Sequence, residues 1–182
     1  MKIGVPKEIK IKESRVGLVP GGVRQLVHDG HELFVETNAG AGIGISDDDY
    51  IQAGAKILPS LEAVFETAQM IIKVKEPQPR EIALMRPHHL MYTYLHLAAD
   101  TELTTGLMKS GATCVAYETI QLPNGSLPLL VPMSEVAGRM STQVGASYLQ
   151  IDHGGKGVLL GGVPGTRRAR VTVIGCGIAG TN

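Results

Sequence analysis

Short apolar runs alternate with stretches of helical periodicity through the first two thirds of the chain. The runs are a few residues long and rich in β-branched and aromatic residues, which indicates buried strands rather than helices. Strands are predicted at residues 2–5, 31–36, 70–75, 90–95 and 112–117. Between them, apolar positions at helical spacing predict helices at residues 20–29, 47–55, 61–68, 79–85 and 100–111. This alternation predicts an α/β fold, a Rossmann-like parallel sheet with helices on both faces.

The pattern changes around a proline-marked hinge at residues 122–132. A long helix with many small residues is expected next, capped by Ser134 and running to about residue 151. A glycine-rich linker at residues 154–165 then leads to a strand at residues 171–174. We therefore expect two domains. Residues 1–128 form a substrate domain, and residues 129–182 form a linker helix followed by the start of a second, incomplete Rossmann domain.

A dinucleotide-binding fingerprint, G-x-G-x-x-G, follows the predicted strand at residues 171–174, with its glycines at Gly175, Gly177 and Gly180. Glycine at these positions permits a tight turn and lets a pyrophosphate approach the amides of the following helix. A glycine-rich turn with a purely structural role is the alternative. The sequence ends at Asn182, so we expect that roughly another hundred residues would be needed to complete such a domain.

Three charged or titratable side chains follow predicted strands. Lys75 and His96 end the strands at 70–75 and 90–95, and Arg15 lies in the loop after the first strand. Ligands bind at the carboxyl ends of strands in open α/β sheets, and an arginine fork can clamp a carboxylate. Taken singly, each also has an ordinary explanation, namely a solvated lysine, a structural histidine and an exposed arginine.

Charge and composition narrow the class of ligand. Seventeen basic residues balance seventeen acidic ones, and no run of like charge is present, which argues against nucleic acid or an anionic membrane as partner. No signal peptide or membrane-spanning run is evident, and Cys114 and Cys176 form no metal or redox spacing. We expect a cytoplasmic protein without a metal site that binds a small molecule.

Several motifs, in order and in register from the first residue, resemble the amino-terminal half of the alanine dehydrogenase/pyridine nucleotide transhydrogenase family. They are the segments at residues 4–8, 15–16, 73–77, 94–98, 116–119, 132–139 and 160–165. Together they are far more specific than any one of them.

The resemblance implies an L-alanine dehydrogenase, which converts L-alanine reversibly to pyruvate and ammonia with NAD as cofactor. It implies that Arg15 and Lys75 hold the carboxylate and carbonyl oxygen of the substrate, and that His96 is the acid and base. It also implies an apolar wall formed by Leu130 and Met133. Ser134 would contact the cofactor, although burial or helix capping would also explain these last three residues.

The resemblance further implies a homo-oligomer, a hexamer in the family, and a carboxyl-terminal half that supplies an aspartate to the active site. Two alternatives stay open. One is the nucleotide-binding subunit of a transhydrogenase, in which hydride passes between two nucleotides without an acid–base group, so that His96 favours the dehydrogenase. The other is a truncated chain without activity of its own.

Overall fold

The computed structural model describes residues 1–182, which divide into two compact units, Met1–Thr119 and Ile120–Asn182. The predicted domain boundary after residue 128 stays a prediction. No helix in the chain is both long enough and apolar enough to cross a membrane.

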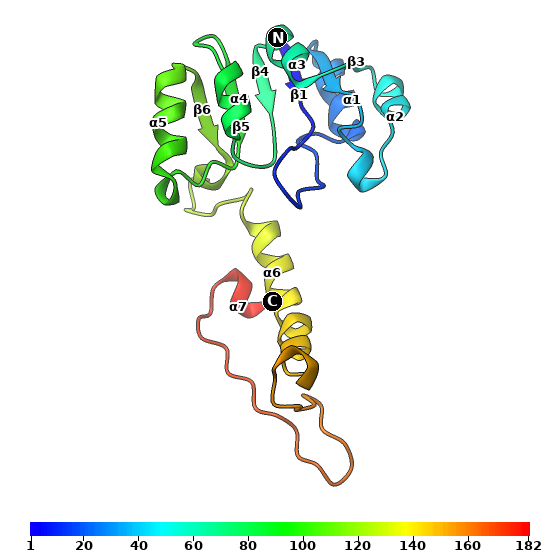
Figure 1. Ribbon diagram of the computed structural model, residues 1–182, viewed down its shortest axis with the longest axis vertical. Helices are drawn as coiled ribbons and strands as arrows, with labels where there is room; N and C mark the ends of the chain where they lie inside the picture. The colour runs from blue at the N-terminus through cyan, green and yellow to red at the C-terminus, as the bar shows by residue number, and fades with distance from the viewer. The chain divides into compact units, whose positions relative to one another are not determined.

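The first unit contains one sheet of six parallel strands in the order β3-β2-β1-β4-β5-β6 (Figure 1). The predicted α/β fold with a parallel sheet is thus confirmed. The strands are β1 (Lys2–Val5), β2 (Glu32–Glu36), β3 (Lys56–Leu58), β4 (Met70–Ile72), β5 (Leu90–Thr93) and β6 (Thr113–Ala116). The order reverses between β1 and β4, which lie side by side although sixty-odd residues separate them in sequence.

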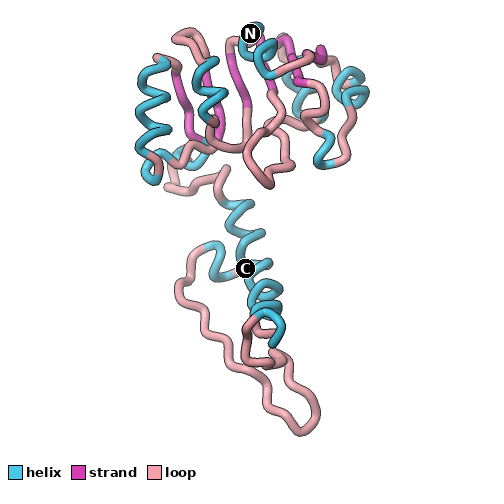
Figure 2. The backbone as a smooth tube through the Cα atoms, viewed as in Figure 1, coloured by secondary structure: helices cyan, strands magenta, loops and turns pink.

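Helices connect successive strands, as the alternation along the chain predicts. They are α1 (Pro20–His28), α2 (Asp47–Gln52), α3 (Leu61–Thr67), α4 (Pro79–Leu84) and α5 (Thr101–Ser110). The predicted cap of α5 is confirmed, because the side chain of Asp100 accepts a hydrogen bond from the Leu103 N–H at 2.9 Å. Figure 2 shows the regular alternation of strand and helix through this unit.

Both faces of the sheet are buried. Neighbouring residues of a strand point to opposite faces, and Ile71 and Ile72 accordingly belong to two different hydrophobic clusters. One cluster includes Val23 of α1 and Tyr50 of α2. The other includes Val64 of α3 and Leu103 of α5. A parallel sheet covered on both sides can be approached by a ligand only at its strand ends.

The strands differ from the sequence prediction in two respects. Strand β3 was not predicted, because it has only three residues, one of them the exposed Lys56, and lies at the edge of the sheet. Strands β4 and β5 end earlier than expected, at Ile72 and Thr93. Lys75 and His96 therefore lie in the loops that follow these strands.

The second unit contains the long helix α6 (Val131–Tyr148) and the short helix α7 (Ile178–Thr181), which pack together. Ser134 does not cap α6. The helix begins at Val131 with Leu130 as its N-cap and Pro132 in its first turn, a position that suits the fixed backbone of proline.

The predicted strand at residues 171–174 is not formed in the second unit. Val171 and Ile174 are 70% and 97% exposed, and the segment is a loop (Figure 2). A strand needs a neighbouring strand for its backbone N–H and C=O groups. No other segment of this unit pairs with residues 171–174.

Candidate functional site

The candidate site begins at the point where the strand order of the first unit reverses. Strands β1 and β4 are adjacent there, and their loops leave the same edge of the sheet. The loop after β1 contains Arg15 and the loop after β4 contains Lys75. Such a reversal opens a crevice at the strand ends, where α/β proteins bind their ligands.

Arg15 forms a two-point ion pair within its own loop. Its Nε and Nη2 atoms donate to the two carboxylate oxygens of Glu13 at 2.9 and 2.7 Å. The Arg15 side chain is 49% exposed, whereas that of Glu13 is only 8% exposed. The hydrogen bonds from Arg15 lower the pKa of Glu13 to about 2 against the opposing effect of burial. The guanidinium group is thus oriented by a carboxylate and still reaches solvent.

Lys75 is held by its main chain. Its N–H donates to Glu8 Oε1 at 3.3 Å, and its carbonyl oxygen accepts from the Thr93 hydroxyl at 2.9 Å. The charge of Lys75 also contributes to lowering the pKa of Glu13. Lys75 and Arg15 therefore act on the same carboxylate, as expected of two cations at one edge of the sheet.

His96 lies in the loop after β5 in a left-handed backbone conformation, with φ of 52°. The Glu118 carboxylate accepts hydrogen bonds from the N–H groups of Leu95 and His96, the latter at 2.7 Å. These bonds lower the pKa of Glu118 although burial acts in the opposite direction. The ring of His96 is exposed and stacks on Tyr94, with 6.2 Å between ring centroids.

Tyr94 connects His96 to the arginine. Burial raises the pKa of the Tyr94 phenol, and the positive charge of Arg15 opposes that rise. Tyr94 in turn packs edge-on against Tyr117, at 4.8 Å between centroids. The first unit therefore brings Arg15, Lys75 and His96 to one edge of its sheet, as the sequence predicts.

Sequence reasoning missed the side chains that fix this edge, chiefly Glu8, Lys73, Glu81, Thr93 and Glu118. Glu8, Lys73 and Glu118 belong to recognised motifs, but the motifs themselves do not show that these side chains are buried. The one hint was Lys73 itself, which stands between the apolar run of β4 and Val74. A lysine inside an apolar run is either at a strand end or paired in the core.

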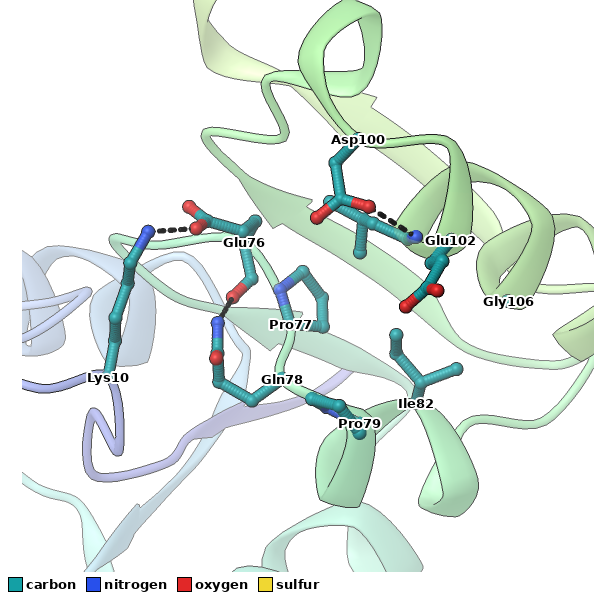
Figure 3. Close-up of a pocket in the computed structure, with 10 residues that line it drawn as sticks. Lys10, Glu76, Pro77, Gln78, Pro79, Ile82, Asp100, Glu102 and Gly106 are labelled. Carbon is teal, nitrogen blue, oxygen red and sulfur yellow. Dashed lines mark hydrogen bonds and ion pairs between the residues drawn. The ribbon is translucent and has the colours of Figure 1, made fainter.

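A separate pocket of about 490 Å³ lies beside these loops (Figure 3). Glu76, which follows Lys75, lines it and pairs with Lys10, and Gln78 Nε2 donates to the Glu76 carbonyl at 3.0 Å. Asp100 and Glu102 lie on the opposite wall. None of the predicted site residues lines this pocket.

In the second unit, the predicted contact residues lie at the amino end of α6. Leu130 is the N-cap, and Met133 and Ser134 follow in the first turn, all three partly buried. Their spacing of three and four residues places them on one side of the helix.

The predicted fingerprint forms a turn that leads into α7. Gly175 has φ of 109°, a conformation that side chains disfavour, and Gly177 is the N-cap of α7. A Cβ atom at Gly180 would lie 2.4 Å from the carbonyl oxygen of Gly175. The turn therefore requires glycine at the first and the last glycine of the fingerprint, Gly175 and Gly180.

Two family models match the sequence. Residues 4–137 match the N-terminal domain of the alanine dehydrogenase/PNT family, and residues 141–182 match its C-terminal domain. This chain belongs to the alanine dehydrogenase/PNT family. The family assignment made from the sequence motifs is thus confirmed.

Relatives in this family align with the chain over its whole length. Alanine dehydrogenases from Geobacillus stearothermophilus and Methanococcus maripaludis are 57% and 54% identical over 182 residues, all of this chain and 49% of each relative. The chain thus spans about half the length of the curated relatives it matches.

Solved structures in the family have the same fold. A structure of L-alanine dehydrogenase superposes with a TM-score of 0.91 at 56% identity, covering 100% of this chain and 50% of the other. A transhydrogenase structure from Sinorhizobium meliloti gives a TM-score of 0.72 at 25% identity, covering 81% of this chain and 44% of the other.

Proposed function

We propose that this chain is the amino-terminal part of an NAD-dependent alanine dehydrogenase. The reaction is L-alanine, NAD and water to pyruvate, ammonium and NADH with release of a proton, and it is reversible. The observation that carries the proposal is the meeting of Arg15, Lys75 and His96 at the edge where the strand order reverses.

Arg15 and Lys75 bind the substrate in this proposal. The guanidinium of Arg15, already oriented by Glu13, offers a planar donor edge to the substrate carboxylate. The ammonium of Lys75 stabilises negative charge on the oxygen that becomes the ketone of pyruvate. Both cations lie close to Glu13, so their charges are partly balanced before the substrate arrives.

His96 moves the protons. It first accepts a proton from the substrate ammonium group and releases that proton to solvent, and hydride then leaves Cα of the free amine to give an iminium. His96 next accepts a proton from the water that adds to the iminium carbon and returns it to the nitrogen. Ammonia then leaves and takes up the hydroxyl proton as the C=O bond of pyruvate forms. An imidazole suits both steps because the same ring nitrogen can accept a proton and donate it again. The exposed ring of His96 and the bonds that fix its backbone to Glu118 support this role.

The nucleotide is held by the second unit in this proposal. The turn at Gly175, Gly177 and Gly180 is the proposed pyrophosphate site, because this fingerprint needs a tight turn and an open backbone approach. Gly175 has φ of 109°, and a Cβ atom at Gly177 would meet no atom within 4 Å. NAD, when bound, supplies the acceptor for the hydride. Leu130 and Met133 offer an apolar surface to the nicotinamide in this proposal, and Ser134 offers the cofactor a polar contact.

The dehydrogenase is preferred over the transhydrogenase for two reasons. The identity is 54–57% to the alanine dehydrogenases and 25% to the transhydrogenase structure. Hydride exchange between two nucleotides also needs no acid–base group, whereas His96 stands at the site edge with its loop fixed.

The test measures NADH formation at 340 nm with L-alanine and NAD at alkaline pH. It uses the 182-residue chain alone and a chimera in which this sequence replaces the matching half of the Geobacillus stearothermophilus relative. Lys75→Ala in each protein is the control. Turnover in the chimera that disappears with Lys75→Ala supports the proposal.

The two proteins answer different questions. Turnover by the 182-residue chain alone would mean that it assembles a complete site without the other half. A folded chimera that is inactive with L-alanine, or whose activity survives Lys75→Ala, would refute the proposed function.

A further inference from the structure

We propose that Glu8 is a positioning residue for Lys75. Its buried carboxylate holds the main chain at residues 74–75, and it thereby fixes the loop of Lys75 to the chain segment that continues to Arg15. This inference rests on the proposed function, because it gives Glu8 a role in binding the substrate through Lys75.

The first observation is the set of bonds to the main chain. Glu8 Oε1 accepts the N–H of Val74 at 2.6 Å and the N–H of Lys75 at 3.3 Å. The Glu8 side chain is 2% exposed, so these bonds have no competition from water. A carboxylate just after β1 thus determines where the main chain after β4 runs.

The second observation is that the carboxylate is itself fixed from the opposite side. Glu8 Oε2 accepts from Lys73 Nζ at 2.9 Å, and Lys73 Nζ pairs with Glu81 at 2.6 Å. The side chains of Lys73 and Glu81 are both 0% exposed. Burial raises the pKa of Glu81, and the charge of Lys73 opposes the rise.

The third observation concerns the other side of Lys75. Its carbonyl oxygen accepts from the hydroxyl of Thr93, which is itself fully buried. Both polar groups of the Lys75 backbone are therefore bonded to side chains of other segments, the loop after β1 and strand β5. Only the Lys75 side chain remains to adjust to a substrate.

Stability alone does not require such an arrangement. Three buried charges are costly to desolvate, and apolar side chains of similar volume often stabilise a protein as well or better. Glu8 and Lys73 of this network follow the adjacent strands β1 and β4, in or next to the loops that contain Arg15 and Lys75. Its position therefore points to the geometry of substrate binding.

Glu81 offers a matched control within the same network. It forms an ion pair with Lys73 as Glu8 does, but it accepts a hydrogen bond from the Gln78 N–H, at 2.7 Å, and not from residues 74–75. Glu8→Gln and Glu81→Gln each remove one buried negative charge beside Lys73. Only Glu8→Gln weakens the bonds to the main chain of Val74 and Lys75.

The kinetic test compares the two variants in the chimera with the Geobacillus stearothermophilus half. We expect Glu8→Gln to raise the KM for pyruvate roughly tenfold or more, with the KM for NADH unchanged and kcat less affected. Both variants should lower the melting temperature by a similar amount. Glu81→Gln should leave the KM for pyruvate within about twofold of the unmodified chimera. Equal KM changes in both variants, or none in either, would overturn the proposal.

A second measurement uses the 182-residue chain and needs no activity. Amide hydrogen exchange at Val74 and Lys75 should be roughly tenfold faster in Glu8→Met than in Glu81→Met, relative to amides in β1. Unchanged exchange in Glu8→Met would overturn the positioning role. An inactive unmodified chimera would refute the proposed function instead, while this exchange measurement still decides whether Glu8 holds the Lys75 loop.

Discussion

The carboxylate of Glu118 accepts the backbone N–H of His96 at 2.7 Å, and both of its oxygens lie 3.2 Å from the N–H of Leu95. These bonds fix His96 where its backbone is left-handed, a conformation that costs energy for a residue with a side chain. A constrained backbone determines where the imidazole can point. The turn after β6 therefore controls the loop after β5.

Glu118→Ala should lower kcat of the chimera roughly tenfold or more, because the freed loop lets the His96 ring move away from its position. Glu118→Gln should retain part of the activity, since an amide oxygen still accepts a backbone N–H. The control is Glu66→Ala, at an exposed position of α3. Full activity in Glu118→Ala would mean that the Glu118 bonds do not position His96 for catalysis.

Glu13 predicts a pH dependence of stability. Its folded pKa of about 2 lies below the ordinary value of 4.5, mainly through hydrogen bonds from Arg15, so the unfolded chain binds a proton more readily. The ion pair thus stabilises the fold fully above about pH 4.5, and this contribution is lost as the pH falls toward 2.

The free energy of unfolding should therefore differ most between wild type and Glu13→Gln near neutral pH, and the difference should shrink on acidification. Urea titrations of both chains at several pH values between about 6 and 3 would measure it. A difference that stays constant over this range would contradict the assigned pKa of Glu13.

The sequence predicts the sheet well because its strands are short apolar runs and the intervening helices have clear starts, such as Asp100 and Pro79. It misses β3, whose register depends on pairing with β2 and not on its own three residues. It wrongly predicts a strand at residues 171–174, because local β-propensity does not provide a partner strand.

The predicted site residues share a simple property, since Arg15, Lys75 and His96 are polar groups that follow apolar strands. The residues that hold them are invisible to this reasoning. Glu8 and Glu118 act on main-chain atoms of segments 66 and 22 residues away. Such contacts arise only from tertiary packing, which composition and periodicity do not encode.

Gly17 keeps the Arg15 loop close to the end of β4. A Cβ atom at Gly17 would lie 2.5 Å from the carbonyl oxygen of Ile72 and 2.9 Å from Cα of Lys73, both backbone atoms that cannot move aside easily. Gly17→Ala should therefore cost about 1–3 kcal/mol of stability. It should also raise the KM for pyruvate in the chimera, because Arg15 moves with its loop.

Gly21→Ala is the matched control for Gly17→Ala. It lies in α1, and the nearest atom to an added Cβ is the mobile end of Arg24, at 4.0 Å. Alanine is favoured over glycine in a helix by up to about 1 kcal/mol, so this variant should be neutral or stabilising. Thermal unfolding would compare the melting temperatures of Gly17→Ala and Gly21→Ala. Equal melting temperatures would mean that the crowding at Gly17 is relieved without a loss of stability.

Lys73→Met should destabilise the chain strongly. Methionine fills a similar volume but leaves Glu8 and Glu81 buried without the cation between them. Removing one partner of a buried ion pair costs about 3–5 kcal/mol. The difference in free energy of unfolding between wild type and Lys73→Met should become smaller at lower pH. Losing Lys73 raises the pKa of Glu81 further, and protonation of Glu81 then removes a buried charge. The exposed Lys109→Met is the control, with a change within about 0.5 kcal/mol.

The triple variant Glu8→Leu, Lys73→Met, Glu81→Leu separates stability from substrate binding. With no buried charge left, an apolar cluster should recover most of the stability that Lys73→Met loses. The main chain at residues 74–75 would still lack its carboxylate acceptor, so the KM for pyruvate should remain raised in the chimera. Urea unfolding would test the predicted recovery of stability, and steady-state kinetics on the same preparation would test the predicted KM for pyruvate. If stability and KM recover together, the three charges serve the fold alone, and Lys75 is positioned without them.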